Sequence, residues 1–195
     1  RGDNKKCNFF EIYESEKINL KKLKFNLFFK SEKCISWNFA GKMINYTFKE
    51  KNGILFSTSA ISDDKKLAQD KDSIFGKIIF KAFDGEMNET FSLGHRNPQG
   101  LIEYKNNIIA TEHGPKGGDE INLISYKNNY GWPESSYGNL YDDEKLKLKR
   151  NEILNLDLYY KKNHKKFGFV EPIFSFVPSI GINDIILISK NFSLM

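Results

Sequence analysis

Short apolar and aromatic runs, separated by turn residues, recur along this chain and restrict the folds open to it. Each run has the length of a β-strand, is rich in β-branched or aromatic residues, and is bounded by turn residues such as Lys51-Asn52-Gly53 and Asp84-Gly85. The predicted strands are Lys24–Lys30, Lys42–Phe48, Ile54–Ser59, Lys77–Phe83, Leu101–Tyr104, Ile108–Thr111, Ile121–Tyr126, Phe167–Phe176 and Asp184–Ser189. Strands this numerous and this closely spaced predict an all-β domain, which is a sandwich, a barrel or a propeller.

Two stretches break the pattern of strands. Asp63–Ser73 is polar and predicts a long loop with at most one helical turn. Asp142–Leu158 carries leucine and isoleucine at helical spacing among lysines. We interpret both as insertions between the strands of a single domain that spans residues 1–195.

The positive charge of the chain points to a solvated surface and not to a nucleic-acid partner. Lys and Arg number 30 against 25 Asp and Glu, for a formal net charge of +5. All but Arg1, Arg96 and Arg150 are lysines, whereas proteins that grip phosphates favour the planar fork of arginine. We therefore expect no nucleic-acid partner.

No apolar run approaches the roughly 18 residues of a membrane-spanning helix, so we also expect no membrane span.

The two cysteines, Cys7 and Cys34, lie near the start of the chain. Their spacing matches no metal motif, which leaves a disulfide or two unpaired thiols. Unpaired thiols are the expectation.

Polar residues suited to chemistry are concentrated in three segments, Gly94–Gly100, Thr111–Glu120 and Asn129–Pro133. In the first segment, Arg96 supplies five guanidinium donors and Asn97 an amide, at a loop that Pro98 restrains. This combination suits an anionic ligand rich in carbonyl groups.

The second segment combines exposed backbone with carboxylates. Gly114-Pro115 and Gly117-Gly118 allow a ligand or ion to approach the main chain closely. Asp119 and Glu120 add hard oxygen ligands of the kind that calcium prefers.

Each of these features alone also has an ordinary structural explanation. Glycine and proline commonly punctuate loops, Trp132 commonly lies in a core, and histidines are commonly hydrogen-bonded structural residues. A metal site made of His95, His113 and Glu112 is conceivable but not favoured, because the spacing matches no metal motif.

Taken together, the three segments resemble the soluble pyrroloquinoline-quinone (PQQ) dependent sugar dehydrogenases, the glucose/sorbosone dehydrogenase family. Gly94–Leu101, Glu112–Leu123 and Asn129–Pro133 reproduce the pattern of that family almost residue for residue. The resemblance extends from about Tyr13 to Ile188. Shorter matching segments are Ala40-Gly41-Lys42, Leu67-Ala68-Gln69-Asp70, Gly76-Lys77-Ile78 and Val177-Pro178-Ser179-Ile180.

The resemblance implies a six-bladed β-propeller that oxidises an aldose sugar to its lactone. PQQ and Ca²⁺ are the implied cofactors, and an external electron acceptor is the implied partner of the reduced quinone. By the same resemblance, the protein is expected to be periplasmic or secreted.

The resemblance also implies roles for individual residues at the cofactor. Arg96 and Asn97 are expected to bind the quinone, with Arg96 placing positive charge where the reduced cofactor becomes anionic. Gln99 is expected to support them from the same loop, and Tyr141 matches an aromatic position beside the cofactor.

Two calcium positions follow from the resemblance. The backbone carbonyls of Gly114 and Pro115 are expected to hold the active-site calcium. Glu120, by its carboxylate, and Tyr130, by its carbonyl, match positions that ligate a second, structural calcium.

One departure from the family pattern concerns catalysis. The catalytic base of the family is a histidine just before the Ala40-Gly41-Lys42 segment, and this position is Asn38 here. An amide does not accept a proton near neutral pH. Either another residue serves as the base, or the chain is a non-catalytic propeller that acts as a binding module. A calcium-dependent lactonase-like propeller is a third alternative.

The second departure is length. Six four-stranded blades need well over the 195 residues of this chain. We therefore expect an incomplete propeller of roughly three to four blades.

Overall fold

The computed structural model describes residues 7–15, 23–36, 40–141 and 160–188. These residues form three antiparallel sheets and two short 3₁₀ helices. The strands of the three sheets are β1 (Glu11–Glu14) and β2 (Asn26–Lys30), then β3 (Met43–Phe48), β4 (Lys51–Ser57), β5 (Lys77–Ala82) and β6 (Asn88–Leu93), then β7 (Pro98–Tyr104), β8 (Asn107–Glu112), β9 (Asp119–Ile124) and β10 (Phe174–Phe176). The 3₁₀ helices are η1 (Ser62–Ala68) and η3 (His164–Phe167).

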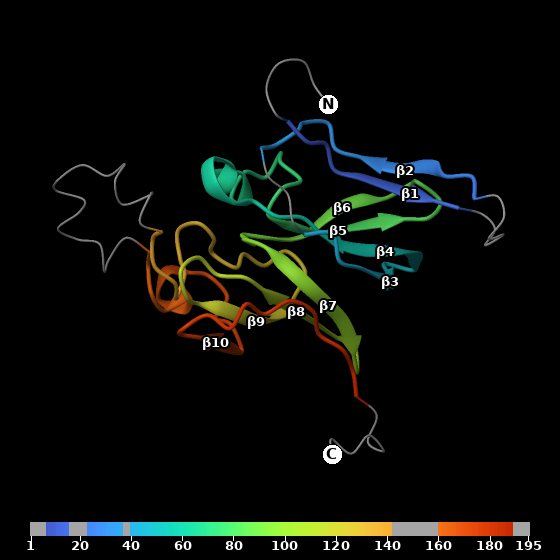
Figure 1. Cartoon of the computed structure of the whole chain (residues 1–195). Coiled ribbons are helices and arrows are strands. Elements are labelled where there is room, and N and C mark those ends of the chain that lie inside the picture. The colour runs from blue at the N-terminus through green and yellow to red at the C-terminus, as the bar shows by residue number, and fades with distance from the viewer. Residues whose placement is uncertain (1–6, 16–22, 37–39, 142–159, 189–195) are drawn as a thin grey trace.

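Both four-stranded sheets are meanders in which each strand pairs with its neighbour in the sequence. The β1–β2 hairpin lies on one side of the β3–β6 sheet, and the β7–β10 sheet lies on the other, as Figure 1 shows. Successive four-stranded meanders packed face to face are the blades of a propeller. The expectation of an all-β fold is confirmed.

The central position of the β3–β6 sheet explains the unbroken apolar runs of β4 and β5. Side chains alternate between the two faces of a strand. On β4, Ile54 and Phe56 pack toward the β1–β2 hairpin, whereas Leu55 packs toward the β7–β10 sheet. On β5, Ile79 faces the hairpin side and Phe80 the other side. Both faces of these strands are buried, so both need apolar residues.

Two strands were missing from the sequence prediction, and two predicted strands differ in the structure. β1 and β6 are short and mostly polar, so they give a weak local signal. The predicted strand Phe167–Phe176 is reduced to β10, because Gly168 has a φ of +84° and Pro172 cannot donate to a sheet. Residues 184–188 form no strand in the described part of the chain, and Ile186 there is 74% exposed.

The expectation of a loop with one helical turn at Asp63–Ser73 is close to the structure, since η1 covers the first half of this segment. The insertion predicted at Asp142–Leu158 lies outside the described residues. No helix among the residues described is both long and apolar enough to cross a membrane.

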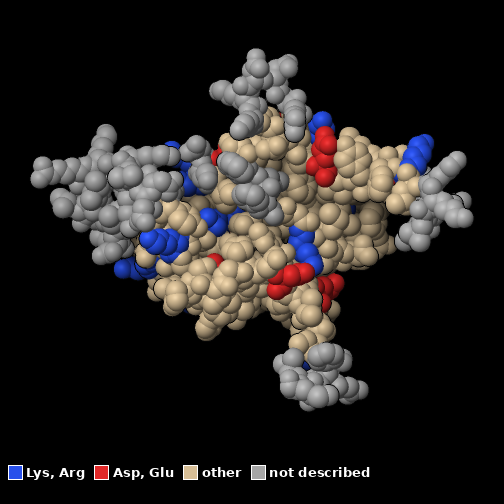
Figure 2. All heavy atoms as spheres, viewed as in Figure 1, with Lys and Arg blue, Asp and Glu red and all other residues tan. Residues whose placement is uncertain are grey.

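Acidic and basic side chains are interspersed on the face of the molecule shown in Figure 2. Several lysines form exposed ion pairs, among them Lys30–Glu11, Lys42–Asp184, Lys49–Glu89 and Lys51–Asp84. Such pairs contribute little to stability. They agree with the interpretation of the lysines as a solvated surface.

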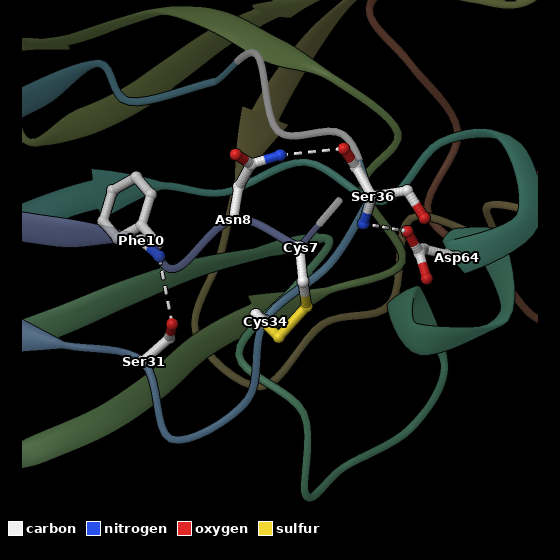
Figure 3. Close-up of a disulfide and its surroundings, with 7 residues drawn as sticks. All are labelled: Cys7, Asn8, Phe10, Ser31, Cys34, Ser36 and Asp64. Atoms are coloured by element: carbon white, nitrogen blue, oxygen red, sulfur yellow. Dashed lines mark hydrogen bonds between the residues drawn. A yellow bond between two sulfur atoms is a disulfide. The ribbon is translucent and has the colours of Figure 1, made fainter. Parts of the chain in front are cut away.

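Cys7 and Cys34 form a disulfide, so the expectation of two unpaired thiols is wrong (Figure 3). The β1–β2 hairpin folds the chain back on itself and brings the segments that flank it together. Asn8 and Ile35 exchange backbone hydrogen bonds of 2.8 and 3.0 Å, and the Cα atoms of the two cysteines are 5.4 Å apart. Sequence spacing alone does not show such a pairing.

The disulfide reinforces polar contacts that fasten the hairpin to its neighbours. The Asn8 side chain donates to the Ser36 carbonyl at 2.9 Å, and the Ser36 amide donates to Asp64 of η1 at 2.9 Å (Figure 3). The hairpin is therefore tied both to itself and to the segment that carries η1.

Replacing both Cys7 and Cys34 with serine is expected to lower the free energy of unfolding by about 3–4 kcal/mol, because the bond closes a loop across a sequence separation of 27. Urea denaturation of the wild-type and double-variant proteins measures this. Dithiothreitol should lower the stability of the wild-type protein and leave the double variant unchanged. A loss below about 1 kcal/mol would contradict the prediction.

Candidate functional site

Loops from the two four-stranded sheets and η3 meet around one pocket. The contributing loops are residues 94–97 between β6 and β7, residues 113–118 between β8 and β9, and the segment after β9. The residues that line the pocket include Arg96, Glu112, His113, Gly114, Pro115, Glu120, Tyr130, Trp132 and His164. Its free space is about 10 Å³, which is room for one water-sized particle. The pocket itself therefore suits an ion or a water, and a planar ligand has to lie across its mouth.

Arg96 is held in the pocket wall by both its backbone and its guanidinium. The Arg96 amide donates to Glu112 at 2.9 Å, and the guanidinium donates to the His113 carbonyl at 3.0 Å. The guanidinium carbon lies 5.3 Å from the centre of the Trp132 ring, in a cation–π arrangement. The positive charge is thus fixed in position before any ligand arrives.

Trp132 is itself fixed from two sides. Its indole N–H donates to the Ala60 carbonyl at 2.7 Å, and its carbonyl accepts from the Gln69 side chain at 2.6 Å. Gln69 also exchanges hydrogen bonds with the Asn129 side chain, at 2.7 and 3.0 Å. The motif residues of the Asn129–Pro133 segment therefore support the surface on which Arg96 stacks.

A buried hydrogen-bond network lies beneath the Arg96 loop. Ser92 Oγ is 2.8 Å from His95 Nε2, and His95 Nδ1 is 3.0 Å from Glu112 Oε1. The Asn122 side chain donates to the same Glu112 oxygen at 2.8 Å. Burial raises the pKa of Glu112, but His95 and the hydrogen bonds from His95, Arg96 and Asn122 outweigh burial and lower it. The ionised Glu112 carboxylate holds the loop in place.

The environment of Glu120 disfavours the ionised form of its carboxylate. It is buried, and burial together with the charge of Glu112 raises its pKa well above the usual range. Glu120 Oε1 is 3.4 Å from His164 Nε2, and Glu120 Oε2 accepts from the Asn122 side chain at 3.2 Å. Each oxygen of this carboxylate therefore faces a nitrogen.

The Gly114-Pro115 loop is shaped by the neighbouring Asp119. Asp119 Oδ1 accepts from the Gly114 amide, and Oδ2 accepts from the amides of Ile180 and Ile182, all at 3.1 Å. Asp119 is fully buried and uses both oxygens in this way. Asp119 therefore positions the loop, although its carboxylate was a candidate ligand for calcium in the sequence.

The structure gathers some of the predicted site residues and separates others. Arg96, Gly114, Pro115, Glu120 and Tyr130 all line the pocket, whereas Asn97, Gln99 and Tyr141 do not. Asn38 lies outside the described residues.

Two of the separated residues differ in their burial. Asn97 is buried, and its side-chain oxygen has no hydrogen-bond partner among the described residues. Tyr141 is 42% exposed. The buried amide oxygen without a partner is consistent with a polar ligand near this loop.

The metal site considered for His95, His113 and Glu112 does not form. His95 turns inward to Glu112, whereas His113 Nδ1 faces Asp119 Oδ1 at 3.9 Å. No group of three or more His, Cys, Asp or Glu side chains in the described ranges is placed to hold a metal ion.

Sequence reasoning missed His164 and the role of Lys77. His164 lies in a lysine-rich stretch without a motif, so no local signal marks it. Lys77 is fully buried, and its ammonium donates to the carbonyls of Leu67, Ala68 and Phe75 at 2.7–3.0 Å. A lysine at the start of an apolar strand is a weak signal of such burial.

The fold and the site together define a class, namely propeller proteins whose blade-connecting loops form a pocket with a fixed arginine and a Gly-Pro turn. The family model for "Glucose / Sorbosone dehydrogenase" matches residues 13–193. The chain therefore belongs to the glucose/sorbosone dehydrogenase family, as the sequence motifs indicated.

Individual relatives agree with this membership. The chain is 33% identical over 132 residues to the aldose sugar dehydrogenase YliI of Escherichia coli, covering 60% of this chain and 34% of YliI. It is 49% identical over 53 residues to quinoprotein glucose dehydrogenase B of Acinetobacter calcoaceticus, covering 27% of this chain and 11% of that protein.

Solved structures show the same fold. The soluble aldose sugar dehydrogenase of Escherichia coli, in its apo form, matches with a TM-score of 0.68 and 23% identity, over 93% of this chain and 57% of that one. The PQQ-bound aldose sugar dehydrogenase of Streptomyces coelicolor matches with a TM-score of 0.52 and 29% identity, over 65% of this chain and 40% of that one. The chain thus spans 57% and 40% of the length of these two propellers.

Proposed function

We propose that this chain takes part in oxidising an aldose sugar to its lactone, with PQQ as the electron-accepting cofactor and calcium beside the quinone. The observation that carries the proposal is Arg96. Its guanidinium is fixed at the pocket by Trp132 and the His113 carbonyl, and its backbone amide is fixed by Glu112. Family membership and a PQQ-bound relative support the choice of cofactor.

The residues present fit these cofactors. PQQ carries carboxylates and quinone oxygens, which match the donors of the planar guanidinium. The unpartnered side-chain oxygen of Asn97, which is an acceptor, is buried at the next residue of the same loop. Because the pocket holds only a water-sized particle, the quinone lies across its mouth in this proposal, and the resemblance adds Gln99 and Tyr141 as further contacts. The carbonyls of Gly114 and Pro115 are the hard oxygens that calcium takes.

In this proposal the chain's own residues bind PQQ and calcium and orient them. When bound, PQQ would accept the hydride of the sugar's anomeric carbon, calcium would polarise the reactive carbonyl, and a general base would take the proton of the sugar hydroxyl. Arg96 stabilises the negative charge that develops on the reduced cofactor. Trp132 and the His113 carbonyl hold that guanidinium, and Glu112 holds the backbone of Arg96, so little reorganisation is needed during the reaction. Electrons then leave to an external acceptor.

The disulfide supports a location outside the cytosol. Structural disulfides persist in oxidising compartments and are rare where thiols are kept reduced. The Cys7–Cys34 bond therefore supports the proposal that the protein is periplasmic or secreted.

Reconstitution tests the proposed activity. The full-length protein that contains this chain is stripped with a chelator, supplied with PQQ and calcium, and assayed for dye reduction with a panel of aldoses. The expected result is turnover that requires PQQ. PQQ-independent turnover, or no turnover with any sugar, would contradict the proposal.

A non-catalytic binding propeller is the second candidate, and Asn38 favours it. If the chain is an enzyme that has lost its base, Asn38→His is expected to raise turnover by about 100-fold or more, since general bases contribute roughly 10²–10⁴-fold. The measurement is dye reduction at saturating PQQ, with Asn38→Gln as the control. An unchanged rate, with PQQ still bound, would instead favour a binding module or a different base.

A further inference from the structure

His164 lies beside Glu120, one of the two residues that the resemblance to the family assigns to a second calcium ion. It is the first residue of η3 and is 1% exposed, and its ring lines the same pocket as Glu120 and Tyr130. Neither ring nitrogen makes a hydrogen bond of good geometry within the part of the chain that is described. Buried polar groups normally have hydrogen-bond partners, so a buried imidazole without a well-formed hydrogen bond needs an explanation.

The imidazole faces both groups that were expected to ligate a second calcium. His164 Nε2 is 3.4 Å from Glu120 Oε1. Burial lowers the pKa of His164, while the charges of Glu171 and Glu112 and the carbonyls of Val170 and Tyr130 act in the opposite direction. The Tyr130 carbonyl and the Glu120 carboxylate therefore both lie close to the ring.

The ring is also held in place. It stacks on Tyr137 with ring centroids 5.3 Å apart and an interplanar angle of 9°. At the start of η3, the side chain of Asn163 accepts from the Lys166 amide at 3.0 Å, and Asn163 has a φ of +66°. The side chain therefore has little freedom to leave Glu120 when a metal ion approaches.

The residues present do not fit a second calcium ion. Calcium takes six to eight oxygen ligands at about 2.3–2.6 Å, and an imidazole is not among its usual ligands. The pocket that contains both implied calcium positions has free space for one water-sized particle, about 10 Å³. One ion beside Gly114 and Pro115 uses that space.

We propose that the His164 imidazole takes the place of the second calcium ion, so that the wall of the pocket around Glu120 is completed by a side chain and not by a metal. Glu120 then has a nitrogen against each oxygen, His164 on one and Asn122 on the other. The neighbouring position at Gly114 and Pro115 is unaffected, and calcium there remains part of the proposed function.

Counting calcium ions tests the proposal. Chelator-treated full-length protein is titrated with CaCl₂ alone by isothermal titration calorimetry, as wild type, as Glu120→Gln and as Glu86→Gln. Glu86 lies at an exposed turn between β5 and β6, so its variant makes the same substitution at a distance from the pocket. We expect all three proteins to bind the same number of calcium ions, with Kd values within about threefold.

Loss of one calcium ion per chain in Glu120→Gln, with Glu86→Gln unchanged, would overturn the proposal. Because Glu120→Gln could fail to fold, a second measurement uses the wild-type protein alone. In crystals of the calcium-loaded wild-type protein, an ion is expected beside Gly114 and Pro115, and an ion within about 2.6 Å of a Glu120 oxygen would also overturn the proposal. Both experiments omit PQQ and sugar, so a failure of the proposed oxidation does not affect their outcome.

Discussion

Replacing Arg96 with alanine is expected to weaken PQQ binding by about 100-fold. The side chain supplies charge-assisted hydrogen bonds, each worth about 1.5–3 kcal/mol, and it is already fixed against Trp132 before the ligand binds. A loss of about 2.7 kcal/mol corresponds to that factor. Fluorescence titration with PQQ in the presence of calcium measures it.

A set of variants distinguishes the contribution of the guanidinium's planar shape to PQQ affinity from the contribution of its charge. Arg96→Lys keeps the positive charge but loses the planar fork and the stacking on Trp132, so its affinity is expected to fall between wild type and Arg96→Ala. Lys71→Ala removes an exposed positive charge and serves as the control. Equal affinity of Arg96→Ala and wild type would show that PQQ does not contact this loop.

Replacing Lys77 with methionine is expected to lower the free energy of unfolding at pH 7 by about 3 kcal/mol. The variant removes three hydrogen bonds from a charged donor, each worth about 1.5–3 kcal/mol, and leaves the Phe75 carbonyl without its donor. This loss is partly offset because a charge is no longer buried. Urea denaturation measures the change. Lys71→Met, at an exposed position, is expected to stay within about 0.5 kcal/mol of wild type.

The difference in the free energy of unfolding between wild type and Lys77→Met should also depend on pH. Burial lowers the pKa of Lys77 to about 8 from the usual 10.5, against the charge of Asp70. Between these two values the unfolded chain binds more protons than the native chain, so wild-type stability rises with pH relative to the variant. The rise approaches about 3 kcal/mol at pH 10.5. A difference that stays flat from pH 7 to 10 would show that the native ammonium keeps its proton.

Lys77 affects the site through η1, because it joins the end of this helix to β5. The Ala68 carbonyl that receives Lys77 also accepts from the Gly94 amide at 3.0 Å. The next residue, Gln69, holds Trp132. A buried lysine remote from the pocket therefore supports the surface on which Arg96 stacks.

Most of the strands and the motif loops could be predicted from the sequence because their signals are local. β3, β5, β8 and β9 lie within one or two residues of the predicted runs, since apolar and turn residues report directly on pleating and burial. The three motif segments were also sufficient to indicate the family. β1 and β6 escaped prediction because mostly polar edge strands lack that signal.

The sequence alone therefore determined the all-β class, most of the strands and the loops that carry Arg96, Gly114 and Pro115. Only the tertiary structure decided which distant residues complete the site: the Cys7–Cys34 bond, the stacking of Arg96 on Trp132, and His164 against Glu120. The physical reason is that strand formation depends on neighbours in the chain. Charge pairing, stacking and disulfide formation depend on neighbours in space, which are set when the sheets pack.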